Sequence, residues 1–400
     1  MSYDGPTTIV HKAARVAEAA ARGADEAERA RRLTPEVVDA VREAGFARHF
    51  VPAAYGGETG TFTELTSAVA VVAEGCTSAG WAASLAAYAG RYAAYLPEKG
   101  QTEIWADGPD ALLAAALMPA GTAERVTGGW RLGGEWKYIS GVHCADWALA
   151  CAPVPADGTD TPGPGGRPPV RYFAVPRGDY SVIESWNPVG MRGTGSDTLA
   201  LDDVFVPEHR TLARADVHAG RAPASDARCH LVPMYAVNAL PFAGPLAGAA
   251  RGALRAWTER TGTRVDRRGN AVAGQSAIQV ALARSAAETD AAELLLHRTA
   301  AVADGTLTPP EAEAAVRGPR DLALAVELLV SAVDRVFRAS GTSGQDLGDP
   351  VQRFWRDLNS AASHVALSFE TTGAAYGAWA LGGGSDGEGG SGGRGAGPVR

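Results

Sequence analysis

The sequence predicts an α+β fold in three parts: an amino-terminal helical domain, a small central β-domain that forms a barrel or sandwich, and a carboxyl-terminal four-helix bundle. Two changes of hydrophobic period predict this order. Apolar residues recur every three or four positions before residue 118, every second position to about residue 207, and again at helical spacing after about residue 232. With 400 residues, the chain is long enough for several packed layers. We place the parts at 1–117, 118–225 and 226–381.

The first part contains helices with recognisable ends. Thr34 is expected to accept the free amides of a first helical turn, Pro35 suits the first helical position, and Gly45 closes the helix. Residues 62–96 keep the helical spacing and carry several aromatic side chains. This stretch indicates a helical core.

The central part is predicted to be all-β because its segments alternate and are rich in β-branched and aromatic residues. Gly or Pro bounds each of them. The stretch 152–169 is too rich in Pro and Gly for helix or ladder, and indicates a long mobile loop. The predicted strands are 130–140, 146–151, 170–176 and 197–207.

Long helical segments return in the third part and predict the bundle. The final residues, 382–400, contain ten glycines and are expected to form a disordered tail. The predicted bundle helices are 239–261, 271–304, 309–340 and 350–381.

Composition limits the function classes. The formal net charge of −8, without a cluster of Lys and Arg, argues against a nucleic-acid surface. The four cysteines lack the spacing of a zinc or iron–sulfur site, so we expect no metal and reduced, buried thiols. No secretory signal is evident at the amino end, and the apolar run 111–120 is too short to span a bilayer. We expect a cytoplasmic protein without a membrane partner.

One glycine-rich motif could be taken for a nucleotide-binding loop. GMRGTGSDT (190–198) resembles a dinucleotide loop, but such a loop must open a helix whose amino end holds pyrophosphate. This one precedes a predicted strand. We therefore predict no nicotinamide site.

Three stretches, in this order along the chain, together resemble the acyl-CoA dehydrogenase superfamily. Within it, the chain is most similar to the two-component flavin-dependent monooxygenases called group D, which include phenol hydroxylases and amino-sugar N-oxygenases. The resemblance covers nearly the whole chain except the tail. The stretches are EIWADGPDALLAAALMPAGTAERVTGGWRLGGEWKYISG (103–141), NPVGMRGTGSDTLALDDVFVP (187–207) and DPVQRFWRDLNSAASHVALSFETTGAAYG (349–377).

His364 distinguishes the two branches. Dehydrogenases of this superfamily commonly carry a catalytic glutamate about two turns after an Arg-Asp pair. Here Arg356-Asp357 is followed by His364 and Val365 at that place, and a second position used by some relatives falls near Asn238. Neither valine nor asparagine can abstract a proton, so desaturation of a thioester lacks its base. The monooxygenase branch typically has a histidine there, as proton acceptor or as stabiliser of a flavin peroxide.

The resemblance implies a monooxygenase that receives reduced flavin, FMN or FAD, from a separate flavin reductase. The flavin reacts with O2 at C4a to give a hydroperoxide that hydroxylates an aromatic carbon or amine nitrogen of a small molecule, by analogy in natural-product tailoring. A homotetramer is also implied. His364 and Ser140 would be catalytic, and other side chains either serve the site or are ordinary core residues. The expected flavin contacts are Trp136, Tyr138, Ser140, Gly141, Thr194, Ser196 and Arg353, and the expected substrate contacts are Tyr88, Tyr92, His143 and Arg192.

Two alternatives remain at this point. An acyl-CoA dehydrogenase-type oxidoreductase could use a relocated base such as Glu259 or Glu370. A degenerate relative could act only as a scaffold.

Overall fold

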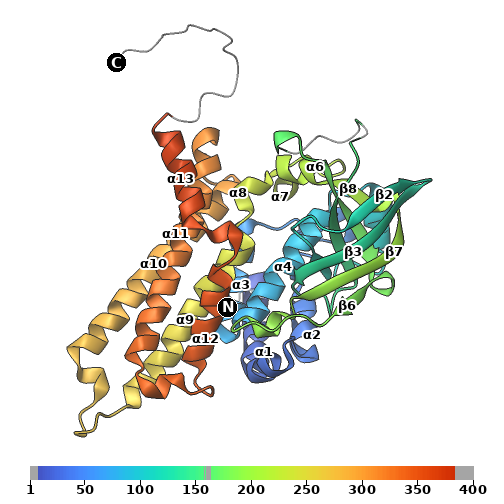
Figure 1. Ribbon diagram of the computed structural model, residues 1–400. Coiled ribbons are helices and arrows are strands. Elements are labelled where there is room, and N and C mark those ends of the chain that lie inside the picture. The colour runs from blue at the N-terminus through green and yellow to red at the C-terminus, as the bar shows by residue number, and fades with distance from the viewer. Residues whose placement is uncertain (1–7, 157, 159–163, 383–400) are drawn as a thin grey trace, which may run out of the picture.

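The computed structural model describes residues 8–156, 158 and 164–382 and has the predicted α+β order of helices, sheets and helices (Figure 1). Helix α4 lies between the sheets and the carboxyl-terminal helices and packs on both. Helix α4 therefore contacts both the β-domain and the bundle. The first helices are α1 (Ile9–Ala30), α2 (Pro35–Ala44), α3 (Phe62–Gly75), α4 (Thr77–Ala93) and α5 (Glu98–Ile104).

The predicted limits of α2 are confirmed, but the predicted cap is wrong. Pro35 begins the helix and Gly45 ends it with φ 87°, a left-handed conformation that suits glycine. Thr34 stands at the N-cap position, yet its side chain accepts no hydrogen bond there. Its hydroxyl instead lies close to Gly23 of α1. Packing between the two helices thus prevails over local capping.

The central part consists of two four-stranded sheets. One has the strand order β1-β4-β5-β8 and the other β2-β3-β7-β6. The four predicted strands are present, together with four short ones that the alternation did not reveal. β1 pairs with β4, so the sheet begins before residue 118. The strands are β1 (Leu113–Ala115), β2 (Thr122–Val126), β3 (Gly129–Ile139), β4 (Trp147–Pro153), β5 (Val170–Pro176), β6 (Ser181–Ile183), β7 (Asp197–Pro207) and β8 (Thr211–Ala213).

Strand β3 is irregular near its carboxyl end. Trp136 pairs with Leu199 and Ile139 with Asp197, so Lys137 and Tyr138 together oppose a single residue of β7. Tyr138 has φ 66°, and the residue is 74% exposed. This β-bulge takes two consecutive backbone units out of register with the ladder, as bulges beside functional sites often do.

Two predicted segments lie partly or wholly outside the described residues. The connection from β4 to β5 contains residues 157 and 159–163, and the tail contains 383–400. The expectations of a mobile loop and a disordered tail therefore stay predictions.

After β8 the chain passes through three short helices into the long helices of the bundle. The prediction of one helix over 350–381 is wrong. It is divided by a break around His364, whose ψ of 132° is extended, and by a short 3-10 turn, Val365–Leu367. The helices are α6 (Arg214–Ala219), α7 (Arg228–Leu231), α8 (Met234–Val237), α9 (Leu240–Thr263), α10 (Ser276–Asp304), α11 (Glu311–Ala339), α12 (Pro350–Ala362) and α13 (Phe369–Ala380).

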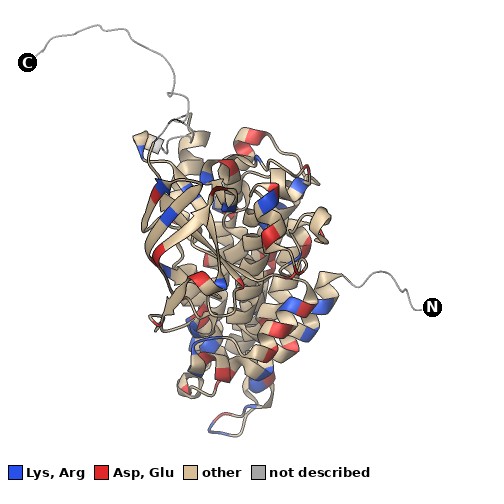
Figure 2. Cartoon of the chain, turned by 90° about the vertical axis from the view of Figure 1, so that its right-hand side faces the viewer, with Lys and Arg blue, Asp and Glu red and all other residues tan. Residues whose placement is uncertain are grey.

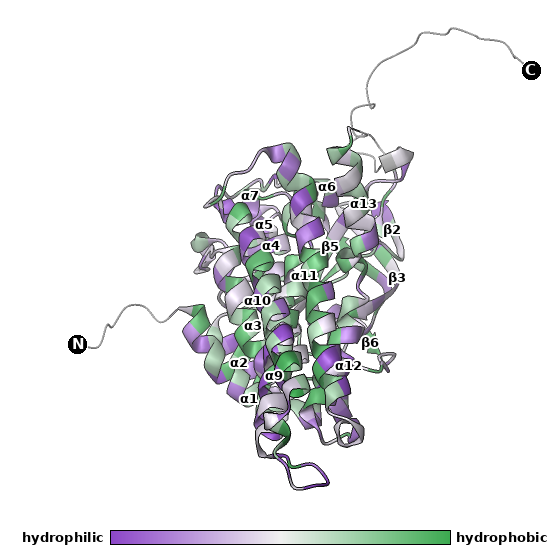
Figure 3. Cartoon of the chain, turned by 90° about the vertical axis from the view of Figure 1, so that its left-hand side faces the viewer, coloured by the Kyte–Doolittle hydropathy of each residue, from purple (hydrophilic) through white to green (hydrophobic). Residues whose placement is uncertain are grey.

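The buried apolar residues form two main clusters, one on each side of α4. One apolar core joins α1, α3, α4 and the bundle, and a second lies between α4 and the sheets. Figure 3 shows hydrophobic and hydrophilic residues alternating along the bundle helices, and Figure 2 shows both signs of charge interspersed on another side. The four cysteines are unpaired, and three of them are buried. Within the described ranges, none of the helices is both long and apolar enough to cross a membrane.

Candidate active site

A cavity of about 710 Å³ lies where α4, β3, the loop before β7, α9 and the break after α12 meet. Its volume is in the range of small-molecule sites, roughly 300–1,000 Å³. The structure brings eight of the predicted site residues to its wall. They are Tyr88, Tyr92, Trp136, Tyr138, Ser140, Thr194, Ser196 and His364.

Hydroxyl groups form a directed chain along one wall. The Thr194 hydroxyl donates to the carbonyl oxygen of Met191 (2.8 Å). Its oxygen must then accept from Ser196 (2.7 Å), whose oxygen accepts from Ser140 (2.8 Å). Ser140 in turn accepts from the indole N–H of Trp81 (3.2 Å).

The direction of this chain is fixed because an indole nitrogen only donates and a carbonyl oxygen only accepts. The proton of each hydroxyl is committed to the next member. Ser140 therefore keeps one free lone pair, with which it can accept a hydrogen bond from a molecule in the cavity.

His364 also lines the cavity, in the break after α12. The backbone N–H of Ala366 donates to its Nδ1 (3.2 Å), so the neutral ring carries its proton on Nε2. The ring stacks on Phe242 with 3.8 Å between centroids and meets the edge of Trp81 at 6.2 Å. Burial in these apolar surroundings lowers the pKa of His364 to about 4. At neutral pH the side chain is thus an uncharged hydrogen-bond donor.

Ionised groups are sparse around the cavity. Among the described lining residues, the only Asp, Glu, Lys or Arg are Glu135 and Lys137, both exposed on β3. Glu259 and Glu370, the relocated bases considered above, are exposed and do not line it. The buried wall therefore offers an imidazole and hydroxyls in place of a carboxylate.

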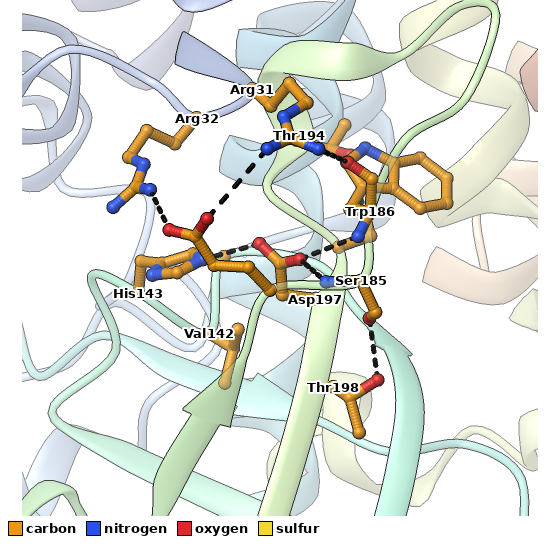
Figure 4. Close-up of polar contacts among 12 residues, drawn as sticks. Arg31, Arg32, Val142, His143, Ser185, Trp186, Thr194, Asp197 and Thr198 are labelled. Carbon is orange, nitrogen blue, oxygen red and sulfur yellow. Dashed lines mark hydrogen bonds and ion pairs between the residues drawn. The ribbon is translucent and has the colours of Figure 1, made fainter.

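Trp186, which the sequence did not single out, is held from three directions beside the cavity (Figure 4). Its backbone N–H donates to Asp197 (2.7 Å), and its carbonyl oxygen accepts from Arg31 (3.1 Å). Its indole N–H donates to the Met191 carbonyl (3.0 Å). Two hydrogen bonds therefore hold the backbone of Trp186, and one holds its ring beside the cavity.

Asp197 organises this region. It also accepts from the N–H of Ser185 (2.6 Å) and contacts Nε2 of His143 at 2.6 Å (Figure 4). Burial opposes ionisation, yet the hydrogen bonds from His143, Trp186 and Ser185 hold the pKa of Asp197 below its usual value. His143 is thereby engaged with a carboxylate and does not line the cavity.

The loop that carries Thr194 and Ser196 is tied to the bundle. The backbone N–H of Met191 donates to Asp357 of α12 (2.6 Å). Burial raises the pKa of Asp357 to about 6, although that N–H partly offsets the effect. A Cβ atom on Gly190 would overlap the carbonyl oxygen of Arg356, so only glycine allows this close approach.

Three further predicted site residues lie away from the cavity wall. Arg353 pairs with Asp25 of α1. Arg192 donates to the carbonyl oxygens of Glu28 (3.2 Å) and Pro188 (3.0 Å). Gly141 contributes only its backbone, which donates to Thr194 (3.0 Å). The contacts of these three residues connect separate segments of the chain to one another, and none of the three side chains lines the cavity.

Trp81 and Phe242 line the cavity and hold Ser140 and His364 in place. Neither role could be predicted from the sequence, because an aromatic residue in a helix usually belongs to the core. The two rings meet where α4 packs on α9, with 5.1 Å between their centroids.

The wall fits a planar, polar-edged cofactor such as a flavin. The bulge at Lys137 and Tyr138 brings a displaced backbone edge to the cavity, and Ser140 offers a lone pair next to it. Reduced flavin differs from oxidised flavin by additional ring N–H groups, which need such acceptors. The residues present are therefore suited to the reduced form.

Comparison with known proteins agrees with this site. Family models described as the amino- and carboxyl-terminal domains of acyl-CoA dehydrogenase match residues 7–103 and 240–369. A FADH2-dependent resorcinol hydroxylase oxygenase component from a Rhizobium species is 35% identical over 393 residues, covering 94% of each chain. The flavin-dependent monooxygenase oxygenase subunit HsaA from Rhodococcus jostii is 32% identical, covering 88% of this chain and 93% of its own.

Solved structures give the same result. The 3-HSA hydroxylase from Rhodococcus sp. RHA1 superimposes with a TM-score of 0.84 at 30% identity, covering 94% of this chain and 97% of its own. XiaF from a Streptomyces species, solved with FADH2 and glycerol, has a TM-score of 0.84 at 29% identity and coverages of 94% and 95%. The chain therefore belongs to the acyl-CoA dehydrogenase superfamily, in the branch formed by the oxygenase components of two-component flavin-dependent monooxygenases.

Proposed function

We propose that this protein hydroxylates an aromatic small molecule with O2 and reduced flavin that a separate reductase delivers. When bound, reduced flavin supplies two electrons and activates O2, so that one oxygen atom enters the substrate and the other leaves as water. The observation that carries the proposal is the cavity wall itself. It pairs a lone-pair acceptor at Ser140 with an N–H donor at His364 and has no buried carboxylate.

Ser140 and the bulge of β3 would hold the flavin. The directed chain from Trp81 to Met191 prevents the Ser140 hydroxyl from turning its proton toward the cavity. The site thus presents an acceptor in every bound state of the cofactor, which favours the reduced ring over the oxidised one.

His364 would act as a hydrogen-bond donor through Nε2–H. Its Nδ1 already accepts the N–H of Ala366, and its low pKa makes the ring a weak proton acceptor. A neutral donor in an apolar environment stabilises negative charge that develops on an oxygen atom. Phe242 and Trp81 keep water from competing for that donor.

The alternative of an acyl-CoA dehydrogenase with a relocated base lacks its residue. Glu259 and Glu370 do not reach the cavity, and Glu135 is on the exposed side of β3. The relatives are oxygenase components, which by name require another component to supply electrons. A flavin reductase is therefore the partner that this function needs.

The proposal is tested by mixing the purified protein with chemically reduced FMN or FAD, air and a panel of phenols. A product one oxygen atom heavier than the substrate, measured by mass spectrometry, is expected. Flavin oxidation with stoichiometric release of hydrogen peroxide for each phenol would contradict it. Anaerobic bleaching of oxidised flavin by an acyl-CoA thioester would favour the dehydrogenase instead.

We also propose that the chain assembles as a homotetramer through the bundle. In the described chain, α13 is largely apolar in sequence but has no buried residue. Leu294 of α10 is 72% exposed and Leu381 is 89% exposed. Exposed apolar groups of this kind commonly mark subunit interfaces. Light scattering is expected to give about four times the chain mass of 41.2 kDa, and Trp379→Glu to lower it.

A further inference from the structure

Two tyrosines form a separate polar feature of the cavity. Tyr88 and Tyr92 are four residues apart on α4, so both side chains lie on one face of the helix. Trp81, which holds Ser140, is on the same helix and also lines the cavity. At 1.5 Å per residue, Tyr88 and Tyr92 are about 10 and 16 Å along α4 from Trp81. They therefore line a part of the cavity remote from the hydroxyl chain.

Neither tyrosine hydroxyl has a hydrogen-bond partner among the described residues. In the part of the chain that the structure describes, no hydrogen bond joins either phenol to another residue, whereas Tyr95 on the same helix donates to the carbonyl of His230. Nor is either hydroxyl sealed from solvent, as the hydroxyl of Tyr172 is. A buried polar group normally has a hydrogen-bond partner, so a phenol that lines a cavity without one indicates that a ligand or an ordered water binds there.

The two rings are held rigidly. Tyr88 meets the edge of Phe50 at 5.4 Å between centroids, and Tyr92 stacks on Tyr172 at 5.9 Å. Their residues are only 3% and 4% exposed. Burial raises the pKa of Tyr88 well above its usual value and that of Tyr92 to about 12. Both are neutral groups that can donate and accept at fixed positions.

Among the described residues, no charged side chain of α4 lines this end of the cavity, although the charge of Arg91 partly offsets the rise that burial causes in the pKa of both tyrosines. Arg91 lies between the tyrosines in sequence, but its guanidinium donates to the carbonyl oxygens of Cys229 (2.6 Å) and Val232 and does not line the cavity. Glu135 and Lys137 are exposed side chains of β3. Moving a carboxylate or ammonium into an apolar site without a counter-charge costs several kcal/mol. This end of the cavity therefore disfavours ionised substrates.

We propose that Tyr88 and Tyr92 select an uncharged aromatic substrate that carries a hydroxyl or carbonyl oxygen remote from the carbon that is hydroxylated. This assignment rests on the proposed function and narrows its substrate class. The tyrosines bind that oxygen, while the aromatic body of the substrate extends along α4 toward Ser140 and His364.

The test measures binding, so that it does not depend on turnover. Isothermal titration of the full-length protein, with and without FMN, uses three probes of similar shape: 2-naphthol, naphthalene and 2-naphthoate. At pH 7, 2-naphthol is expected to bind about tenfold more tightly than naphthalene, as one net hydrogen bond provides, and 2-naphthoate more weakly than 2-naphthol. In the Tyr88→Phe/Tyr92→Phe variant, the difference between naphthol and naphthalene should fall below about twofold.

Tyr172→Phe is the matched control, because it removes a buried phenol that touches Tyr92 but does not line the cavity. It should keep the wild-type preference. Equal binding of naphthol and naphthalene, a preference for naphthoate, or an unchanged preference in the double variant would overturn the assignment. If the preference is found but no probe gains oxygen in the reduced-flavin assay, the proposed function fails while the binding assignment stands.

Discussion

The role of His364 as a neutral donor can be tested by substitution. In His364→Ala, the cavity loses the Nε2–H donor while the fold keeps the break after α12, since the side chain makes one hydrogen bond there, from Ala366. A donor to a developing charge contributes roughly 1.5–3 kcal/mol, so product formed per reduced flavin consumed should fall by about 10- to 150-fold. Hydrogen peroxide release should rise in proportion. His364→Gln keeps an N–H donor and is expected to lose less than about tenfold.

The pH dependence separates a donor from a base. With a pKa of about 4, fewer than about one in a hundred His364 rings is protonated above pH 6. Product yield should therefore be flat from about pH 6 to 8, because the ring keeps the same protonation state over that range.

The measurement is a rapid-mixing experiment with reduced flavin at each pH, with product and peroxide quantified together. A wild-type yield that titrates with a midpoint near 6.5, and does so no longer in His364→Gln, would refute the donor role. An unchanged yield in His364→Ala would remove His364 from the mechanism altogether.

Three further changes address the supports of the site. The raised pKa of Asp357 means that the folded state holds its proton more tightly than the unfolded state. The free energy of unfolding of the wild type should therefore fall as the pH rises from about 4 to 6, by on the order of 1–3 kcal/mol in urea unfolding. Asp357→Asn should remove that fall. A steeper loss in the variant would contradict this. Gly190→Ala should cost about 1–3 kcal/mol because its Cβ overlaps the Arg356 carbonyl, whereas Gly262→Ala, with open space, serves as control. Thr194→Val breaks the hydroxyl chain and should weaken reduced-flavin binding about fivefold, with oxidised flavin unaffected; equal loss for both forms would argue against a directed chain.

The sequence predicted the order of the parts because the hydrophobic period changes from helical to two and then back to helical. It also placed Ser140 and His364 on one site, through resemblance over long stretches. It did not predict the break at His364, since the apolar spacing continues across residues 350–381 and nothing local marks a stop. That break gives the imidazole an extended backbone and an Ala366 N–H as partner.

The sequence was least informative for polar side chains that could either line the site or hold the fold together. His143, Arg192 and Arg353 are polar residues near site motifs, yet each is engaged by a carboxylate or a carbonyl from another element. Such partners lie far away in sequence, so spacing does not reveal them. Trp186 is the converse case, because its three anchors become visible only when the loop, α1 and β7 are assembled.

The hydrogen bond from Met191 to Asp357 spans 166 residues. During synthesis, the loop that carries Thr194 and Ser196 leaves the ribosome long before α12 exists to hold it. The catalytic chamber is consequently completed only after α12 has emerged, because Asp357 follows Met191 by 166 residues. A nascent or truncated chain that ends before α12 would lack both His364 and the anchor of this loop, and would have no enclosed chamber in which reduced flavin could meet oxygen.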